Sequence, residues 1–467
     1  MGYRIEKDFL GEKRIPDDVY WGIQTLRGRE NFHITGMPVS REPYFVKAFG
    51  YVKKAAAMAN RDLGVLDSRI AEAIIRACDR LIAGELVDEF VTDFIQGGAG
   101  TSTNMNANEV IANLALESLG HQKGDYQHVH PNDHVNFGQS TNDVYPTAFH
   151  LGLILRLESY LEALRQLRDA LVAKGREFEG VLKMGRTHLQ DAVPMSLGAE
   201  FRGWGTTIGE EVERIDGVRR ILHSVNLGAT AIGTTVTAAP GYPELATKHL
   251  ASITGIPFTL AGDLIEATSD TGDYVLLSGV LKHTATKLTK ICNDLRLLAS
   301  GPRCGLNEIN LPQLQPGSSI MPGKVNPVIP EVVNQTSFLV IGLDLTVTLA
   351  ASAGQLQLNV MEPVITFALF ASITAMERAV ESLRVNCVQG ITANAERSRD
   401  MVLNSLGIVT VLKPSLGYKQ CAEIARECHE TGKSLEEVVV KERKLLTQQK
   451  FDEIFCFENL IDPKFES

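Results

Sequence analysis

Hydrophobic and polar positions along the chain alternate mostly at helical spacing. In residues 151–171 leucines recur every three or four positions and charged residues fill the positions between them. That pattern predicts an amphipathic helix of many turns. Residues 273–300 repeat the pattern, and Val52–Gly64 and Ile70–Gly84 are rich in strong helix formers and end at glycine. We therefore predict helices in all four segments.

Two later segments, residues 331–352 and 364–387, are apolar on nearly every side. A helix that is apolar all round has to be buried on all sides. One chain supplies few partners for such helices, so the pattern indicates a long bundle completed by other copies of the chain, with closed dihedral symmetry. Patterns typical of strands are short and few. The fold class predicted is all-α.

Length and pattern predict three domains. Residues 1–139 are mixed but mainly helical, residues 140–392 form a central domain of long helices, and residues 393–467 form a small helical domain.

Composition excludes several classes of protein. The 467 residues are 44% hydrophobic and 22% charged, which is ordinary for globular proteins, and the net charge of −10 argues against a nucleic acid as the partner. Seven cysteines are scattered without CxxC spacing, which is typical of reduced thiols and not of a zinc site. The first residues lack the apolar core of a signal peptide, and the long uncharged runs are broken by Gly, Pro and Thr. We expect a cytoplasmic protein without a membrane span.

Four polar segments rich in Gly or Asn interrupt the helices, at residues 97–109, 130–143, 185–194 and 316–327. The candidate residues in these segments are neutral hydrogen-bond donors with one lysine and one histidine, a set that suits a small dianion, whose carboxylates need several oriented donors. The candidate residues are Thr101, Ser140, Thr141, Asn142, Thr187, His188, Ser318, Ser319, Lys324 and Asn326.

The last segment, "PGSSIMPGKVNP", contains the prolines and glycines typical of a long loop but only one charged residue. Long loops inside compact domains are usually either functional or disordered, and apolar Ile320, Met321 and Val325 are not typical of a solvated tail. This loop is predicted to bind a ligand or to close over one.

Each segment also has a structural interpretation. The glycine-rich segment at residue 97 fits a helix cap, "STND" fits an N-cap with Asp143 three residues after Ser140, and His188 fits a buried histidine bonded to backbone. The spacing of His128, His130 and His134 matches no standard metal site. It is the coincidence of four such segments that favours a binding site.

Several long motifs resemble the aspartase/fumarase superfamily over essentially the whole chain. They are "GSSIMPGKVNP", "GGAGTSTNMNANEV", "HPNDHVN", "QSTND", "KMGRTHLQDAVP", "SGPRCGLNEI" and "NVMEPV", in the expected order. The resemblance implies an all-helical homotetramer with a long central bundle, whose active sites are each assembled from loops of three chains.

Within the superfamily the chain resembles the ammonia-lyases more than the hydratases, because it has Thr141 in "STND" and Glu362 in "NVMEP". This implies reversible conversion of L-aspartate to fumarate and ammonia, by removal of the Cβ proton through an aci-carboxylate intermediate. A fumarate hydratase and a non-catalytic protein on the same scaffold are the alternatives.

The resemblance also implies roles for the candidate residues. Ser318 would be the general base, held as an alkoxide by backbone N–H groups and Lys324, on a loop that closes as a lid over the substrate. Thr101, Ser140, Thr141 and Ser319 would hold the β-carboxylate. Thr187, Lys324 and Asn326 would hold the α-carboxylate, and Asn142 and catalytic His188 would lie near the amino group. The resemblance implies no organic cofactor and no metal site, and leaves activation by a divalent cation open.

The chain has Thr235, Val236 and Thr237 where the superfamily usually has Gly-Leu-Asn. The segment with His130, Asn132 and Asp133 resembles a second, non-catalytic dicarboxylate site, and a polar turn that caps a helix is the alternative.

Overall fold

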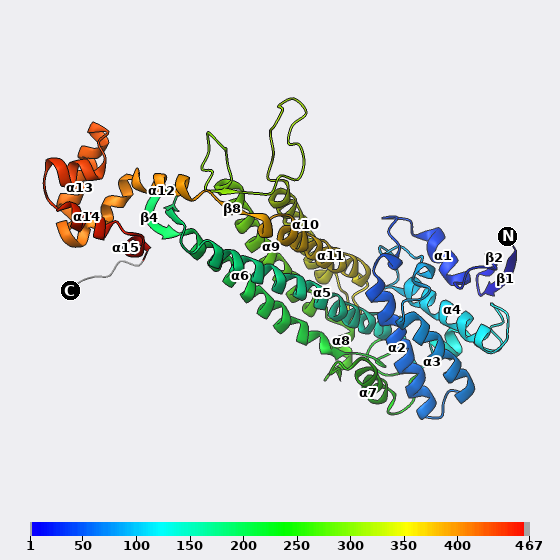
Figure 1. Ribbon diagram of the computed structural model, residues 1–467. Coiled ribbons are helices and arrows are strands. Elements are labelled where there is room, and N and C mark those ends of the chain that lie inside the picture. The colour runs from blue at the N-terminus through cyan, green and yellow to red at the C-terminus, as the bar shows by residue number, and fades with distance from the viewer. Residues whose placement is uncertain (1, 462–467) are drawn as a thin grey trace. The chain divides into compact units, whose positions relative to one another are not determined.

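The computed structural model describes residues 2–461 and consists mainly of α-helices, which confirms the predicted fold class (Figure 1). Two compact units are each formed by three stretches of chain. The first contains Met1–Glu162, Glu213–Ala285 and Ser337–Glu377, and the second contains Ala163–Val212, Thr286–Thr336 and Arg378–Ser467. The three-domain division drawn from the sequence stays a prediction, and residues 462–467 of its last domain lie outside the described residues.

Shorter helices of the first unit pack around a core of small and apolar side chains. In α3 the buried residues Ala71, Ile74, Cys78 and Leu81 follow helical spacing, and the Asp67 carboxylate caps its first turn. These helices are α1 (Ile23–Asn31), α2 (Pro43–Asp62), α3 (Ser68–Ile82), α4 (Thr101–Ser118), α7 (Tyr242–Thr254) and α8 (Leu264–Ser269). The two helices predicted before residue 85 are confirmed, with α2 beginning earlier than its alanine-rich part indicates.

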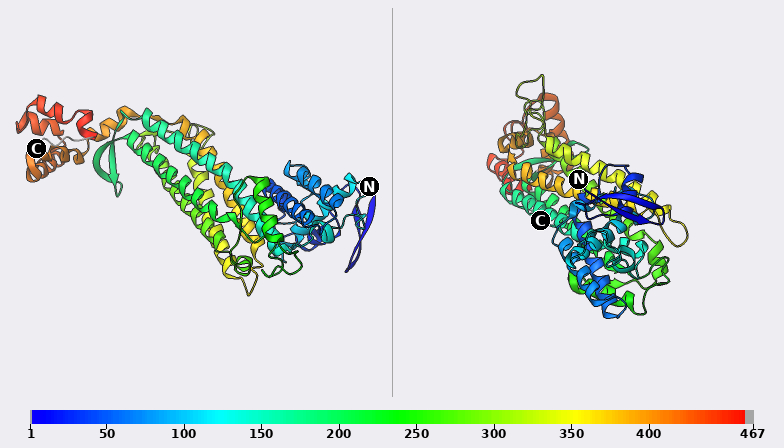
Figure 2. Two further views of the ribbon diagram at one scale, coloured as in Figure 1. Left: turned by 90° about the horizontal axis from the view of Figure 1, so that it is seen from below. Right: turned by 90° about the vertical axis from the view of Figure 1, so that its right-hand side faces the viewer.

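Strands are short and form two-stranded sheets, as the sequence predicts. β1 (Tyr3–Asp8) and β2 (Gly11–Pro16) make an antiparallel hairpin, drawn in dark blue near the N-terminus in Figure 2. β3 (Leu182–Thr187) and β4 (Gln190–Ser196) make a second antiparallel hairpin. The remaining pairs are β5 (Ser224–Val225) with β6 (Thr259–Leu260), and β7 (Ile309–Asn310) with β8 (Thr392–Ala393).

Five further helices are long, with 23 to 37 residues each. They are α5 (Thr141–Glu177), α6 (Leu197–Arg219), α9 (Gly272–Leu298), α10 (Val328–Ser352) and α11 (Glu362–Asn386). The leucine repeat of residues 151–171 lies within α5, which begins ten residues earlier because Val144, Tyr145 and Phe149 continue the same buried face. The predicted helices at residues 273–300, 331–352 and 364–387 are confirmed.

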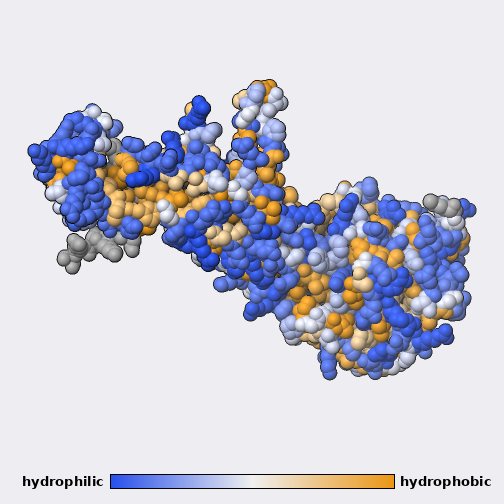
Figure 3. All heavy atoms as spheres, in the orientation of Figure 1, coloured by the Kyte–Doolittle hydropathy of each residue, from blue (hydrophilic) through white to orange (hydrophobic). Residues whose placement is uncertain are grey.

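Within one chain the apolar residues of α10 are not all buried, and their predicted burial against other copies of the chain stays a prediction. Phe338, Leu339, Leu345 and Leu349 are each more than half exposed within one chain. Hydrophobic residues accordingly gather on the surface where α10 and α11 lie (Figure 3). By length and hydropathy alone, Val328–Ser352 and Glu362–Gly390 would also pass as membrane spans, a test that core helices of soluble proteins pass as well. The predicted absence of a membrane span stays a prediction.

The end of the second unit has its own small core. Leu182 and Met184 of β3 pack with Val402, Ile408 and residues of the last helices. These helices are α12 (Ala395–Leu403), α13 (Lys413–Thr431), α14 (Gln448–Ile454) and α15 (Phe457–Ile461). The predicted small helical region at the end of the chain is therefore tied to the β3–β4 hairpin by apolar contacts.

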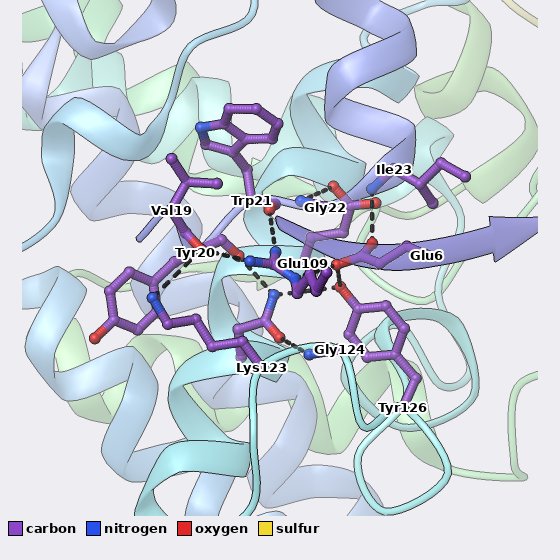
Figure 4. Close-up of polar contacts among 12 residues, drawn as sticks. Glu6, Val19, Tyr20, Trp21, Gly22, Ile23, Glu109, Lys123, Gly124 and Tyr126 are labelled. Atoms are coloured by element: carbon purple, nitrogen blue, oxygen red, sulfur yellow. Dashed lines mark hydrogen bonds and ion pairs between the residues drawn. The ribbon is translucent and has the colours of Figure 1, made fainter. Parts of the chain in front are cut away.

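A buried carboxylate of α4 organises the start of α1 (Figure 4). Glu109 accepts hydrogen bonds from the backbone N–H groups of Gly22, Gln24 and Thr25 and from the Thr25 hydroxyl, at 2.6 to 3.1 Å. A carboxylate at a helix N-terminus satisfies N–H groups that have no partner within the helix. This side chain thereby fixes α1 against α4.

Glu109 is expected to make the stability of the protein depend on pH. Burial raises its pKa to about 7, against the opposing effect of its hydrogen-bond donors. A folded-state pKa above that of the unfolded chain gives stability that is complete below about pH 4.5 and is lost as the pH rises through about 7. Between pH 5 and 8 the free energy of unfolding should fall by about 2 kcal/mol more in the wild type than in Glu109→Gln. Urea unfolding at both pH values measures the difference.

Glu117→Gln, on the exposed side of the same helix, is the control and should keep the wild-type slope. Equal slopes in the wild type and Glu109→Gln would mean that the donors around Glu109 outweigh its burial.

Candidate active site

The loop before α4 places Thr101 at the helix start. Gly98, Ala99 and Gly100 have φ of 86°, 54° and 92°, a left-handed run that turns the chain sharply into the helix. The Thr101 hydroxyl donates to the Gly98 carbonyl at 2.7 Å and is exposed. A Cβ atom on Gly100 would overlap the ring of Tyr145 of α5. Glycine is therefore required where the two helices come together.

Gly100→Ala should lower the free energy of unfolding by about 2–4 kcal/mol, because it adds overlap with Tyr145 to the cost of a positive φ. Gly120→Ala is the matched control, since Gly120 has φ of 85° but open space around it. Its loss should be about 1 kcal/mol. Equal losses in denaturant unfolding would contradict the close approach of the two helices.

The "STND" segment forms a reciprocal cap at the start of α5. The Ser140 Oγ accepts from the Asn142 N–H at 3.2 Å, and the Asp143 carboxylate accepts from the Ser140 N–H at 3.2 Å. This is the geometry of a capping box. Asp143 also accepts from the Thr230 N–H, and the Asn142 amide donates to the Ala231 carbonyl. The N-cap interpretation of this segment is confirmed.

The N-termini of α4 and α5 lie next to each other. The Asn104 amide, one turn into α4, donates to Thr141 Oγ1 at 3.1 Å. Both helix starts present the positive end of the helix dipole, which favours an anion. Thr101 and the residues Ser140, Thr141 and Asn142 thus come together within the first unit, in an arrangement that suits a carboxylate.

A buried polar network supports this arrangement. Lys53 of α2 is fully buried. Its ammonium group donates to Asn136 Oδ1 and Gln139 Oε1 at 2.8 and 2.9 Å. Asn136 Oδ1 also accepts from the Asn104 amide. Burial lowers the pKa of Lys53 to about 7 and raises the pKa of Asp143 to about 7, while the attraction between the two opposes both shifts. This network joins α2, α4 and the segment before α5.

Sequence reasoning missed Lys53. Its signal was a lysine at an otherwise apolar position of an alanine-rich helix, which in isolation is typical of a solvated side chain. Only its packing against "HVNFGQ" shows that it is buried.

The β3–β4 hairpin places Thr187 and His188 at its tip. Thr187 pairs with Gln190, and the two loop residues His188 and Leu189 have φ of 54° and 61°. Positive φ at both positions of a two-residue hairpin loop is the pattern of a type I′ turn. Thr187 and His188 are exposed, so the alternative of a buried structural histidine is wrong within this chain. Non-glycine residues at positive φ are found at functional sites more often than elsewhere.

The loop at residues 316–327 is closed at its base and exposed along its length. The Gly317 N–H donates to the Lys324 carbonyl at 2.7 Å, and the Asn326 amide donates to the Gly317 carbonyl at 2.8 Å. Figure 1 shows the chain between α9 and α10 as extended loops that lead out of the helices. Ile320 is 83% exposed although it is apolar. The loop thus has the exposure of a segment that contacts something outside its own unit.

Ser318 has an environment that favours a negatively charged oxygen. Its Oγ accepts hydrogen bonds from the N–H groups of Ile320 and Met321, at 3.2 and 3.0 Å. Donors aimed at a hydroxyl oxygen stabilise the alkoxide more than the alcohol. Lys324 is exposed on the same loop, and within residues 2–461 no side chain of opposite charge pairs with it. Ser319 is exposed beside Ser318.

The candidate residues fall into two sets. Thr101, Ser140, Thr141 and Asn142 belong to the first unit, and Thr187, His188, Ser318, Ser319, Lys324 and Asn326 belong to the second. Within the second unit the residues lie on two separate segments, the hairpin tip and the loop. The described part of the chain shows no hydrogen bond between these two segments.

The histidines near residue 130 serve as hydrogen-bond partners for local backbone. His130 Nδ1 accepts from the N–H groups of Asn132 and Asp133, and His134 Nδ1 accepts from the His130 N–H. This is the polar turn predicted as the alternative for this segment, and the second dicarboxylate site stays a prediction. Among residues 2–461 no three His, Cys, Asp or Glu side chains are grouped so as to hold a metal ion.

The segment Thr235–Thr237, where the sequence differs from the usual Gly-Leu-Asn of the superfamily, lies beside the candidate site. It follows Thr230 and Ala231, which bond Asp143 and Asn142, and Thr235 and Thr237 have φ of 55° and 76°. The sequence change therefore affects a loop that supports the start of α5.

Family models place this fold and this loop in one class of enzyme. Residues 11–342 match the model described as "Lyase", and residues 408–462 match the model described as "Fumarase C C-terminus". The chain belongs to this family of lyases, the aspartase/fumarase superfamily.

Curated relatives are similar over nearly their full length. The chain is 55% identical to aspartate ammonia-lyase from Helicobacter pylori, over 98% of both chains. It is 57% identical to aspartate ammonia-lyase from Pseudomonas aeruginosa, over 99% of this chain and 97% of the relative.

Solved structures agree with the fold. A fumarate lyase:delta crystallin from Brucella melitensis bound to cobalt is 51% identical and superposes with a TM-score of 0.95, over 98% of this chain and 99% of that one. A class II fumarase from Schistosoma mansoni is 35% identical with a TM-score of 0.91, over 99% and 100%.

Proposed function

We propose that the protein is an aspartate ammonia-lyase, which interconverts L-aspartate with fumarate and ammonia. The observation that carries the proposal is its identity of 54–58% to curated aspartate ammonia-lyases over nearly the whole chain. The fumarase structure is more distant, at 35%. The paired N–H donors on Ser318 Oγ support the same chemistry, since the reaction needs a strong base.

Removal of the Cβ proton is the difficult step. The Ser318 alkoxide takes this proton, and the electron pair of the Cβ–H bond moves onto the neighbouring carboxylate, which becomes a doubly charged aci-carboxylate. The pair then forms the Cα–Cβ double bond as the Cα–N bond breaks, and the amino group, which is protonated in the substrate, leaves as neutral ammonia with the electrons of that bond. Catalysis therefore depends on donors that hold the extra charge in the intermediate.

The first-unit residues are proposed to hold that charge. The adjacent starts of α4 and α5 bring hydroxyl groups and the positive ends of two helix dipoles close together, which supports the binding of the β-carboxylate by Thr101, Ser140 and Thr141 together with Ser319. The exposed Lys324, with Thr187 and Asn326, is proposed to bind the α-carboxylate. Asn142 and His188 are proposed to lie near the amino group.

We also propose a homotetramer whose active sites are shared between three chains. The exposed apolar face of α10, at Phe338, Leu339, Leu345 and Leu349, supports burial against other copies. The exposed positions of His188 at a hairpin tip and Lys324 on a loop support contributions to sites completed by a neighbouring chain.

The ultraviolet absorbance of fumarate tests the activity directly. Purified protein should consume fumarate only when ammonium is present, with aspartate as the product. Loss of fumarate without ammonium, giving malate, would replace the proposal by a fumarate hydratase. An unchanged absorbance in both conditions would leave a non-catalytic protein on this scaffold.

A further inference from the structure

A cavity of about 140 Å³ lies in the first unit behind the start of α5. Four carboxylates line it: Glu266 and Asp270 near its exposed side, Asp273 half-buried, and Glu362, which is only 6% exposed. No lysine or arginine of the described residues lines this cavity. A cavity of this charge favours a cation.

Glu362 is the unusual member of the set. It is the first residue of α11, and no hydrogen bond or ion pair of residues 2–461 reaches its carboxylate. Buried carboxylates are ordinarily paired or hydrogen-bonded because losing water is costly. Burial raises the pKa of Glu362 to about 8, no neighbouring group offsets that effect, and a cation in the cavity would favour the ionised form. The side chain lines the cavity without a partner from the protein.

Two other polar side chains of the wall, His150 and Asn226, present acceptor atoms. His150 Nδ1 lies 3.1 Å from the Leu222 carbonyl oxygen and 3.0 Å from the Ser224 carbonyl oxygen. Since a carbonyl can only accept, Nδ1 carries the hydrogen and Nε2 keeps a lone pair. Burial lowers the pKa of His150 to about 4, which keeps the ring neutral.

Asn226 completes this pattern. Its amide nitrogen donates to the Asn142 carbonyl at 3.0 Å and to Thr268 Oγ1 at 3.1 Å. Both amide hydrogens are therefore used, and Oδ1 remains as an acceptor. A wall that contains carboxylates and acceptor atoms favours a ligand that donates hydrogen bonds and carries positive charge.

We propose that this cavity binds an ammonium ion. Ammonium has four N–H donors, no acceptor and a size near that of water, so it matches a small wet cavity lined by acceptors. A directly coordinated divalent metal fits less well, because among residues 2–461 no three acidic or histidine side chains converge as metal ligands do.

The role of this ammonium site in the reaction rests on the proposed function. Ammonia is a product of the reaction, and Asn226 joins the cavity wall to the backbone of Asn142, which is proposed to lie near the amino group. Pro146, Thr147 and His150 of the wall also belong to α5, whose first residue is Thr141. The cavity thus lies where ammonium could be held beside the reacting segment.

Thermal unfolding of the full-length protein tests binding without relying on activity. Ammonium chloride should raise the Tm of the wild type by a few degrees over tetramethylammonium chloride of equal ionic strength, since a ligand that binds only the folded state stabilises it. Glu362→Gln should lose this rise. Asp273→Asn should reduce this rise in Tm. It provides a second test of the site if Glu362→Gln folds poorly. Glu381→Gln, an exposed carboxylate on the same helix, is the control and should behave as wild type.

A kinetic split gives the second readout. In the amination direction, Glu362→Gln should raise the KM for ammonium by roughly tenfold, because one charge-assisted hydrogen bond is lost. The KM for fumarate should stay unchanged. An ammonium-dependent Tm rise that persists in Glu362→Gln would overturn the proposal. So would an equal or larger Glu362-dependent rise with potassium or magnesium chloride. If the wild type lacked lyase activity, the proposed function would fail, and the Tm series would still decide whether ammonium binds.

Discussion

Ser318→Ala removes turnover almost completely, by roughly 10⁴-fold in kcat or more, because the base that takes the Cβ proton is lost. Two N–H groups of its own loop donate to the Ser318 Oγ, and Lys324 lies on the same loop. That environment stabilises an alkoxide, which alanine cannot supply. Water could occupy the vacated space, but water without these fixed donors is a far weaker base. Initial rates of fumarate formation from L-aspartate measure the loss.

A measurement of the free energy of unfolding distinguishes loss of the base from loss of the folded structure. Ser318 is on a partly exposed loop, so the free energy of unfolding should change by less than about 1 kcal/mol. Ser434→Ala is the matched control, because the Ser434 Oγ also accepts a hydrogen bond from backbone, the Glu437 N–H at 3.2 Å, and is exposed. It should leave activity unchanged. If Ser318→Ala kept more than a few per cent of kcat, another residue would have to be the base.

Mixing two inactive variants should restore activity if the sites are shared between chains. Ser318→Ala lacks the base and His188→Ala lacks the imidazole at the hairpin tip, so each pure tetramer is nearly inactive. After random exchange of subunits, about a quarter of the sites would combine an intact loop from one chain with an intact hairpin from another. Fumarate formation should therefore rise toward about a quarter of the wild-type rate.

A second mixture serves as the control. Ser318→Ala and Lys324→Met alter the same loop, so no exchange of subunits can produce a loop with both residues intact. That mixture should stay inactive. Mass measurements on differently labelled chains would show whether subunits have exchanged. Recovery in neither mixture, despite exchange, would place His188 and Ser318 of one site on the same chain or remove one of them from the site.

The apolar face of α10 shows what a helical pattern leaves undetermined. The sequence predicted that residues 331–352 form a helix whose burial is completed by other copies of the chain, and the helix is present. One chain covers only part of it, and Phe338 and Leu349 remain exposed. The periodicity of a sequence reports which residues avoid water, but it does not report which chain covers them. A single chain therefore leaves this surface open.

The local chemistry of the site was largely predictable. "STND" forms the cap that its spacing predicts, because Ser140 and Asp143 need only three residues of helix to reach each other's N–H groups. The serine-rich loop is a loop, because Gly and Pro exclude a helix there. The exposure of His188 was not predictable, since it follows from a hairpin with a two-residue loop, whose strands LKMGRT and QDAVPMS do not alternate regularly between hydrophobic and polar residues.

The sequence by itself determined the long helices, the four polar segments that interrupt them and the family to which the chain belongs, because these depend on neighbouring residues and on motifs that can be read in order. Tertiary structure alone decided that Lys53 lies buried beneath the start of α5, that Gly100 touches Tyr145, and that Glu362 faces a cavity with no partner. Burial and pairing of charges arise from segments far apart in the chain. No local pattern encodes which of them will meet, so these contacts had to be seen in the folded protein.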